Sequence, residues 1–298
     1  MEKPAPAYEG RPLPRPRDEV VDQGLGFDVA TLLDRRRALR FLGLGAAGAV
    51  LTACSGGSSG TTTTSSSASA SGEIPDETAG PYPGDGSNGP DVLEQSGVVR
   101  GDIRSSFGTG SATAEGVPMT LDLVVADLAK GGSPFAGVAV YVWHCDRAGR
   151  YSLYSPGIEN ENYLRGVQLA DADGRVRFTS IFPACYDGRW PHIHFEVYPD
   201  QAGITDATQA IATSQVALPQ NVCEAVYAQS GYEQSTANLA KVSLSNDNVF
   251  GDDSGALQLA TVTGDVTSGY QVTLDVGVDT TTKPSGGAPP AGGQPPSR

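Results

Sequence analysis

The sequence predicts an all-β fold, a β-sandwich of mostly antiparallel strands with one short helix. Apolar or alternating runs of six to ten residues recur along the chain, and Gly, Pro and Asp separate them as turns separate short strands. Only one segment, Asn221–Gln229 after Pro219, has the pattern of a helix. The predicted strands are Val98–Arg104, Met119–Leu128, Val138–Asp146, Val176–Phe182, His192–Tyr198, Thr213–Leu218, Gln258–Val266 and Tyr270–Val278.

An export signal is predicted at residues 1–53. Arg35–Arg37 precede an apolar, Gly/Ala-rich run, Phe41–Ala53. A membrane-spanning helix needs about 20 apolar residues, so this shorter run fits the hydrophobic region of a signal peptide. RRRALR resembles the twin-arginine export pattern, and Leu51–Cys54 resembles a lipobox, in which the cysteine is acylated. A plain signal peptide cleaved nearby is the alternative. We expect a cell-surface or periplasmic lipoprotein, or otherwise a secreted protein, that meets the membrane only through a lipid on Cys54.

Two low-complexity segments flank the foldable part of the chain. Residues 54–72 consist almost entirely of Ser, Thr, Gly and Ala, which predicts a flexible linker. Residues 281–298 are rich in Pro and Gly, which predicts a disordered tail. One domain is therefore predicted at residues 73–280, long enough to bury a single core.

The charge of the chain excludes two classes of partner. Twenty basic residues face 34 acidic ones, for a net charge of −14. Nucleic acids and anionic membrane surfaces both require a basic patch, so neither is an expected partner. Histidine is scarce as well: the chain has three, and two of them lie two residues apart.

These two histidines predict part of a metal site. His192 and His194 lie in the segment RWPHIHFEVY, within a predicted strand. Alternate side chains of a strand share a face, so both imidazoles point the same way, about 7 Å apart along the chain. They would supply half of a metal's ligands. The third histidine, His144, is adjacent to Trp143, and we expect it to pack rather than to bind.

The residues leave three choices for the other ligands. Glu196 continues the same strand face, which would give a ferrous site of two histidines and one carboxylate. Cysteine ligands would indicate zinc, but no CxxC spacing is present. A tyrosinate oxygen prefers ferric iron, and Tyr186 lies six residues before the first histidine. Tyr151, Tyr154 and Tyr163 are further candidates.

Several spaced segments resemble one enzyme family. VYVWHCDRAGRYS, NYLRGVQLADADGRVRFTSIFPACYDGRWPHIHF and TSQ at 213–215 are similar, in order and spacing, to the intradiol ring-cleavage dioxygenases. The likeness is stronger to exported single-domain members related to the protocatechuate 3,4-dioxygenase β chain. ETAGPYPG, Glu77–Gly84, resembles their T-x-GP-aromatic segment. The resemblance covers roughly residues 77–278 and implies a β-sandwich with one Fe(III) per chain.

The family's functional residues fall on defined positions of this sequence. The implied iron ligands are Tyr151, Tyr186, His192 and His194. Arg189, three residues before the first histidine, is implied to stabilise negative charge during catalysis, and Gln215 matches the glutamine after the next strand. Tyr186 is also implied to be catalytic, because the substrate displaces it from iron in the family.

The resemblance implies an oxidoreductase that opens a catechol between its two hydroxylated carbons. Both atoms of dioxygen are incorporated, which gives a muconate-type diacid. In protocatechuate-cleaving members a longer insertion precedes the histidine pair, whereas here only Asp187–Pro191 intervenes, so the preferred catechol is left open. Two alternatives remain: a ferrous oxygenase using His192, His194 and Glu196, and a non-catalytic surface β-sandwich with a degenerate site.

Three cysteines remain after Cys54. An exported domain permits one disulfide and one thiol, and the resemblance favours Cys185–Cys223 with Cys145 free and buried. The sequence DADGRV at Asp171–Val176 has too few ligands for a calcium loop and predicts a turn that joins two strands.

Overall fold

The structure is a computed structural model that describes residues 7–8, 11–12 and 72–284. The apolar run of the predicted signal, Cys54, the linker up to Ser71 and the tail from residue 285 lie outside the described residues. None of the helices in the described part of the chain is long and apolar enough to cross a membrane.

The chain separates into two compact units, Met1–Thr64 and Ser65–Arg298. In the first unit, β1 (Ala7–Tyr8) pairs antiparallel with β2 (Arg11–Pro12). All other described elements belong to the second unit.

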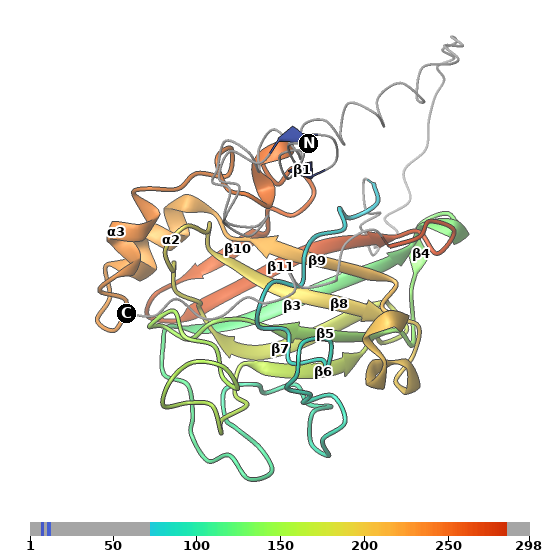
Figure 1. Cartoon of the computed structure of the whole chain (residues 1–298), viewed down its shortest axis with the longest axis horizontal. Coiled ribbons are helices and arrows are strands. Elements are labelled where there is room, and N and C mark those ends of the chain that lie inside the picture. Colours follow the sequence, from blue (N-terminus) through green and yellow to red (C-terminus); the bar gives the residue numbers. More distant parts are fainter. Residues whose placement is uncertain (1–6, 9–10, 13–71, 285–298) are drawn as a thin grey trace, which may run out of the picture. The chain divides into compact units, whose positions relative to one another are not determined.

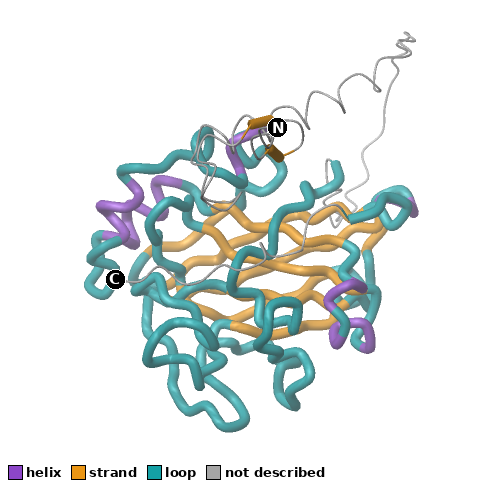
Figure 2. Tube along the Cα trace, in the orientation of Figure 1, coloured by secondary structure: helices purple, strands orange, loops and turns teal. Residues whose placement is uncertain are grey.

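Two sheets form the second unit, and strands dominate its centre while loops surround them (Figures 1 and 2). The first sheet has the order β10-β11-β3-β4, and β7 pairs with residues 118–124 of β3, whereas β4 pairs only with Ala126 and Asp127. Its strands are β3 (Pro118–Asp127), β4 (Ser133–Pro134), β7 (Arg175–Ile181), β10 (Thr261–Asp265) and β11 (Gly269–Val278). β3 and β11 pair in parallel, and the other pairs are antiparallel.

The second sheet is fully antiparallel and has the order β6-β5-β8-β9. Its strands are β5 (Ala139–Trp143), β6 (Arg165–Leu169), β8 (His192–Tyr198) and β9 (Ala212–Ala217). Every residue of β5, β8 and β9 is buried. A strand buried on both faces usually has a continuous apolar sequence rather than an alternating one. AVYVW of β5 has this character, whereas HIHFEVY of β8 alternates polar with apolar residues although both of its faces are buried.

A segment from the start of the domain covers the outer face of this second sheet. We call residues 75–83 the covering segment. The covering segment contacts β9 at two points. Glu77 N donates to the backbone oxygen of Thr213 on β9 (2.7 Å), and the Ser214 Oγ of β9 donates to Pro75 O (2.6 Å). On β5, Tyr141 Oη donates to Pro83 O (2.7 Å). The covering segment therefore crosses the sheet from β9 to β5, and it roofs the strand that carries the histidine pair (Figure 1).

The helices are short and lie at one end of the sandwich or in its loops (Figure 2). They are α2 (Gln220–Tyr227), α3 (Ser235–Leu239) and the 3₁₀ turns η2 (Leu128–Lys130), η3 (Ala202–Thr205), η4 (Ala207–Gln209) and η5 (Phe250–Asp252). The predicted helix corresponds to α2, and the one-turn α3 was not predicted.

The all-β fold class is confirmed, and most predicted strands match within three residues. Val98–Arg104 is not a strand: Val99 and Asp102 form only isolated bridges, the first to β6 and the second to β7. Because it contacts both sheets, this segment links their edges instead of joining either. β6 was not predicted, since its sequence RGVQL contains only two apolar side chains, Val167 and Leu169.

The predicted disulfide is wrong. Cys145, Cys185 and Cys223 are all free and buried. Each sulfur faces a different backbone carbonyl: Ala184 O at 3.6 Å, Arg189 O at 3.5 Å and Leu218 O at 3.9 Å, respectively. The thiols therefore act as weak donors within the core.

The Asp171 segment is a turn between β6 and β7, as predicted. Asp171 Oδ1 accepts hydrogen bonds from the backbone N–H groups of Asp173 and Arg175, both at 2.9 Å. Gly174 takes a left-handed conformation (φ 73°), which glycine adopts without strain.

Candidate metal centre

The two histidines of β8 bring their Nε2 atoms together. Both side chains are 2% exposed, and the Nε2 atoms lie 3.1 Å apart. His192 Nδ1 contacts Trp190 O at 2.5 Å, and because a carbonyl only accepts, Nδ1 carries the proton and Nε2 keeps its lone pair. Two nitrogen ligands at right angles on one metal, each about 2.1 Å from it, would be roughly 3.0 Å apart. The pair therefore has the separation of adjacent ligands.

The ring of His194 is held by its cross-strand neighbour. Trp143 on β5 pairs directly with His194, and the two rings stack with centroids 4.9 Å apart and planes 6° apart. A Cβ placed on Gly80 of the covering segment would approach His194 Cε1 to 3.2 Å. Gly80 also has a positive φ of 72°. A glycine at this position lets the covering segment lie against the imidazole.

Two tyrosine hydroxyls join the histidines. Tyr186 Oη lies 3.1 Å from His192 Nε2. The Tyr151 ring is 5.9 Å from the Tyr186 ring and 6.3 Å from the His194 ring, centroid to centroid. Tyr151 Oη is buried without a hydrogen-bond partner, which is costly for a hydroxyl unless a ligand satisfies it.

The other candidate tyrosines point elsewhere. Tyr154 Oη donates to Asn88 Oδ1 (2.7 Å) and accepts from Gly84 N (2.8 Å). Tyr163 Oη donates to Asp146 Oδ2 (3.3 Å). Both hydroxyls are satisfied away from the histidines, so the geometry favours Tyr151 and Tyr186 among the tyrosines.

Burial sets the protonation of these groups. It lowers the pKa of His192 and His194 well below 6.5, so both imidazoles are neutral at pH 7. It raises the pKa of Tyr186 to about 12 and that of Tyr151 well above 10. A bound cation reverses this preference for tyrosine, because the metal's own charge stabilises the phenolate.

The donor set fits ferric iron. The Nε2 atoms of the two imidazoles converge with the Tyr186 hydroxyl. The Tyr151 ring lies beside them with a buried hydroxyl that has no partner, and hard oxygen donors suit a hard cation. Tyr151, Tyr186, His192 and His194 would hold the ion. Sequence reasoning named these residues, and the structure brings them together.

Arg189 and Gln215 lie beside this cluster and contact each other. The Arg189 side chain is 13% exposed, and its Nη2 donates to Gln215 Oε1 (2.6 Å). Gln215 Nε2 donates in turn to Thr78 O of the covering segment (3.0 Å). Arg189 Nε donates to Asp247 Oδ2 (2.9 Å). Sequence reasoning missed Asp247, which lies in a polar loop 58 positions away.

Arg165 is a second buried arginine that sequence reasoning missed. It is 1% exposed, and all of its acceptors are uncharged. They are Ser152 Oγ, Ser152 O, Pro83 O, Tyr82 O and Tyr141 Oη, at 2.7–3.0 Å. Arg165 thus ties the covering segment to the residue that follows Tyr151.

Glu196 does not join the histidines. Its Oε2 accepts from Tyr198 Oη (2.8 Å), and burial raises its pKa to about 8, so it is protonated at pH 7. Among residues 72–284, no three His, Cys, Asp or Glu side chains form a metal-binding group. The ferrous His192–His194–Glu196 alternative is therefore not supported.

His144 packs away from the cluster, as predicted. Its Nδ1 lies 2.8 Å from Cys145 O, and its Nε2 lies 2.7 Å from Ser180 Oγ. Both ring nitrogens are occupied.

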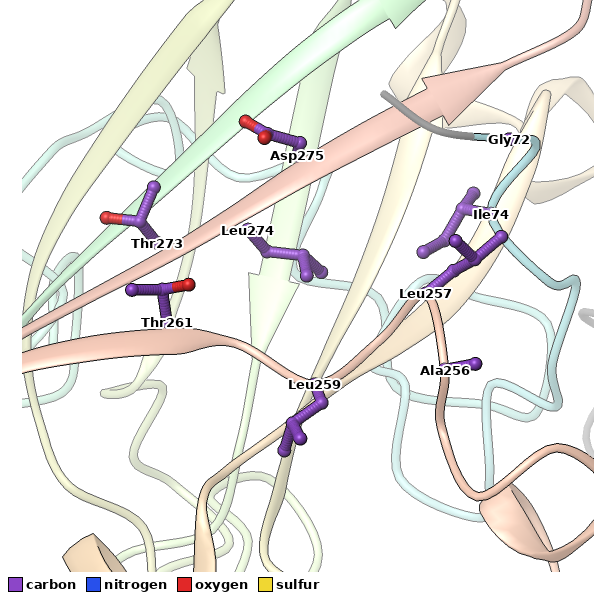
Figure 3. Close-up of a pocket in the computed structure, with 9 residues that line it drawn as sticks. All are labelled: Gly72, Ile74, Ala256, Leu257, Leu259, Thr261, Thr273, Leu274 and Asp275. Atoms are coloured by element: carbon purple, nitrogen blue, oxygen red, sulfur yellow. The ribbon is translucent and has the colours of Figure 1, made fainter. Parts of the chain in front are cut away.

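One cavity in the described part of the chain lies away from the cluster, and another lies beside Tyr186. One, of about 200 Å³, is lined by residues 256–261 and by β11, and it contains no predicted site residue (Figure 3). The other, of about 390 Å³, is lined by Tyr186 and by the segments 147–149 and 231–241.

Comparisons with known proteins find dioxygenases. Residues 88–193 match Dioxygenase_C, a family model described as a dioxygenase. The chain is 38% identical over 56 residues to chlorocatechol 1,2-dioxygenase of Rhodococcus opacus, which is 19% of this chain and 22% of that protein. It is 32% identical over 114 residues to the protocatechuate 3,4-dioxygenase beta chain of Burkholderia cepacia, which is 34% and 48%, respectively. Each match spans less than half the length of the relative.

The fold of this chain is similar to that of a solved structure. An intradiol ring-cleavage dioxygenase from Tetranychus urticae superposes with a TM-score of 0.57 at 20% identity, over 72% of this chain and 98% of that one. At this identity the likeness concerns the fold. The chain is therefore similar in sequence to dioxygenases across residues 88–193, and its sandwich has the fold of a solved intradiol ring-cleavage dioxygenase.

Proposed function

We propose that this protein is an exported Fe(III) intradiol dioxygenase. It would cleave a catechol-type ring between the two hydroxylated carbons and add both atoms of dioxygen, giving a muconate-type diacid. The observation that carries the proposal is the convergence of the Nε2 atoms of His192 and His194 with Tyr186 Oη and the unpartnered Tyr151 Oη.

Ferric iron held by these four side chains would bind the two catechol oxygens and make the ring reactive toward dioxygen. The chain's own contribution begins with Tyr186, the more loosely enclosed of the two tyrosines. Its hydroxyl would leave the cluster when a catechol arrives and would hold one of the catechol protons. The cavity of about 390 Å³ beside Tyr186 offers room for its ring to move.

Arg189 would supply fixed positive charge where negative charge develops. Its guanidinium is protonated at any accessible pH and cannot act as a ligand. Held between Asp247 and Gln215, it needs no reorganisation during the reaction, which is the condition under which such a donor is most effective. Gln215 links it to Thr78, so the covering segment and the arginine are placed together.

The covering segment would also exclude water from the site. Tyr82 packs against Tyr151 and Tyr154, with ring centroids 4.8 and 5.3 Å apart. This aromatic wall suits a flat, apolar ring. The short Asp187–Pro191 connection trims the pocket relative to protocatechuate-cleaving enzymes, and we assign the substrate as a catechol without further detail.

Export, with a lipid on Cys54, is the second part of the proposal. It rests on the arginine-rich start of the apolar run and on the lipobox-like Leu51–Cys54. The Ser/Thr/Gly linker would then separate a membrane anchor from the catalytic domain.

An anaerobic titration tests the activity. Purified mature protein is assayed for iron, and catechols are added without oxygen while absorbance is followed. We expect about one ferric ion per chain, a tyrosinate charge-transfer band that shifts on catechol binding, and ring-opened diacid once oxygen is admitted. Iron-loaded protein that binds no catechol and forms no diacid would indicate the non-catalytic alternative.

A further inference from the structure

Asp247 is a buried carboxylate beside the proposed site, and the proposed function names it only as one of the two partners of Arg189. Its side chain is 0% exposed. It lies in the loop before η5 and reaches back to the turn that carries Arg189. A buried carboxylate is stable only when its charge and lone pairs are matched.

Five hydrogen bonds match the charge and the lone pairs of the Asp247 carboxylate. Asp247 accepts from Arg189 Nε (2.9 Å) and, at the longer distance of 3.4 Å, from Arg189 Nη2. It also accepts from the backbone N–H groups of Trp190 (2.7 Å), Val249 (2.9 Å) and Phe250 (3.1 Å). The backbone contacts fix the carboxylate, and the carboxylate fixes the guanidinium.

The Arg189 guanidinium donates hydrogen bonds to two different side chains. Asp247 holds the Nε edge, while Gln215 Oε1 accepts from Nη2 at 2.6 Å. Phe250, whose backbone N–H is bound by Asp247, places its ring 5.9 Å from the guanidinium carbon and 6.5 Å from the His192 ring. The plane of the guanidinium is therefore set by contacts that a single charge could not provide.

We propose that Asp247 is a positioning residue that orients the Arg189 guanidinium toward the Tyr151–Tyr186–His192–His194 cluster. This rests on the proposed function, in which Arg189 stabilises charge on the substrate. Asp247 does not touch the substrate. It acts through Arg189, and its loss leaves a buried arginine free to turn away or to draw in water.

The first test compares Asp247→Asn with Asp122→Asn. Asp122 is the control because it is likewise 0% exposed and pairs with an arginine, Arg177, but it lies on β3 of the other sheet. At equal iron content, Asp247→Asn should keep the charge-transfer band and the anaerobic catechol shift but turn over about 10- to 100-fold more slowly. Asp122→Asn should match wild type in turnover. Unchanged turnover in Asp247→Asn overturns the proposal.

Chemical rescue separates positioning from a purely structural role. Millimolar guanidinium should restore part of the turnover of Arg189→Ala, because Asp247 and Gln215 still form its binding site. The double variant Arg189→Ala/Asp247→Asn should not be rescued, and without guanidinium it should be no slower than Arg189→Ala alone. Equal rescue of both, or additive losses, would contradict the proposal.

Arg189→Lys covers the case in which Asp247→Asn does not fold. Lysine keeps the positive charge but cannot engage Asp247 and Gln215 with one planar fork. We expect full iron content, wild-type colour and a 10- to 100-fold loss of turnover. Near-wild-type turnover would mean that charge alone suffices and that Asp247 orients nothing.

One readout does not depend on activity. With gallium(III) in place of iron, the Nε–H proton of Arg189 should give a protected NMR signal in wild type and lose that protection in Asp247→Asn. A protected signal in an enzyme without turnover would leave Asp247 in its role and refute only the proposed function. An unprotected signal in wild type would overturn the role of Asp247.

Discussion

Arg165 donates two hydrogen bonds to Ser152, one to Oγ and one to the backbone oxygen, both at 3.0 Å. Ser152 directly follows Tyr151, and the same guanidinium also binds Tyr82 O and Pro83 O. One buried cation thus fixes the backbone of a proposed iron ligand relative to the segment that covers it.

Replacing Arg165 by lysine should destabilise the domain. Lysine offers three donors where arginine offers five, so at least two of the five buried hydrogen bonds are lost, at about 1–3 kcal/mol each. We expect the free energy of unfolding to fall by about 2 kcal/mol or more in urea denaturation. Arg104→Lys, at a half-exposed arginine paired with Asp102, is the control and should stay within about 0.5 kcal/mol of wild type. Equal effects of the two variants would refute this role of Arg165.

Colour should separate the liganding tyrosines from their neighbours. Tyr151→Phe and Tyr186→Phe should each shift or bleach the charge-transfer band of the iron-loaded protein, because each removes one phenolate oxygen. Tyr154→Phe and Tyr163→Phe should leave the band unchanged, since their hydroxyls bind Asn88 and Asp146. Absorbance spectra at matched iron content decide this, and a colourless wild type with full iron would exclude both tyrosinates.

Iron content and turnover should respond to different residues. His192→Ala and His194→Ala should lose iron, measured by mass spectrometry, because each removes a nitrogen donor. Arg189→Ala should keep iron, colour and the catechol-induced shift, yet lose about 10²–10³ in rate, the usual effect of removing one electrostatic donor. His144→Gln is the control for a histidine outside the cluster, and iron loss in that variant would mean that the cluster is misassigned.

Stability should depend on pH through Glu77. Burial, with the nearby negative charge of Asp252, raises its pKa from 4.5 to about 8. The folded state therefore binds this proton more tightly than the unfolded state, so its contribution is full below pH 4.5 and is lost as pH rises to about 8. Urea denaturation across this window should show a smaller fall for Glu77→Gln than for wild type. Parallel curves for the two proteins would be inconsistent with a raised pKa.

Anchoring should depend on Cys54. If Leu51–Cys54 is a lipobox, wild type should partition into detergent, and Cys54→Ala should not be processed at that site. Replacing Arg35 and Arg36 by lysine should block export if the twin-arginine route is used. Wild type recovered free in the medium, with an N-terminus beyond Cys54, would refute lipidation while leaving export intact.

Local pattern predicted the fold class and most strands, because short apolar runs between turn residues are a property of neighbouring positions. β6 could not be predicted in this way. Arg165, its first residue, is buried because it forms hydrogen bonds to residues up to 83 positions away, and a local hydrophobic pattern contains no sign of such contacts. Asp247 was missed for the same reason, since an aspartate among Ser and Asn reads as a turn residue. Cysteine spacing likewise carries no information about which way each sulfur points.

Residue types and spacing reduced the number of candidate metal ligands but could not identify the final set. The alternation of a strand placed His192 and His194 on one face, and Glu196 shares that face. Distance along the strand separates the carboxylate from the histidines, and its hydrogen bond to Tyr198 satisfies it. Among the tyrosines, hydrogen bonds to Asn88 and Asp146 distinguish the satisfied hydroxyls from the unpartnered one, and these contacts span up to 66 positions.

The parallel pairing of β3 with β11 has a consequence for biosynthesis. Met119 pairs with Tyr270, and Asp127 pairs with Val278. The first long strand of the domain therefore cannot complete its pairing until the last strand has been synthesised. When the ribosome has added residue 194, it has synthesised every proposed ligand. About 75 more residues must be added before β11, the parallel neighbour of β3, begins. Closing so long a loop carries an entropic cost that only the finished sheet repays. The nascent chain therefore exposes this edge of β3 until β11 has been synthesised.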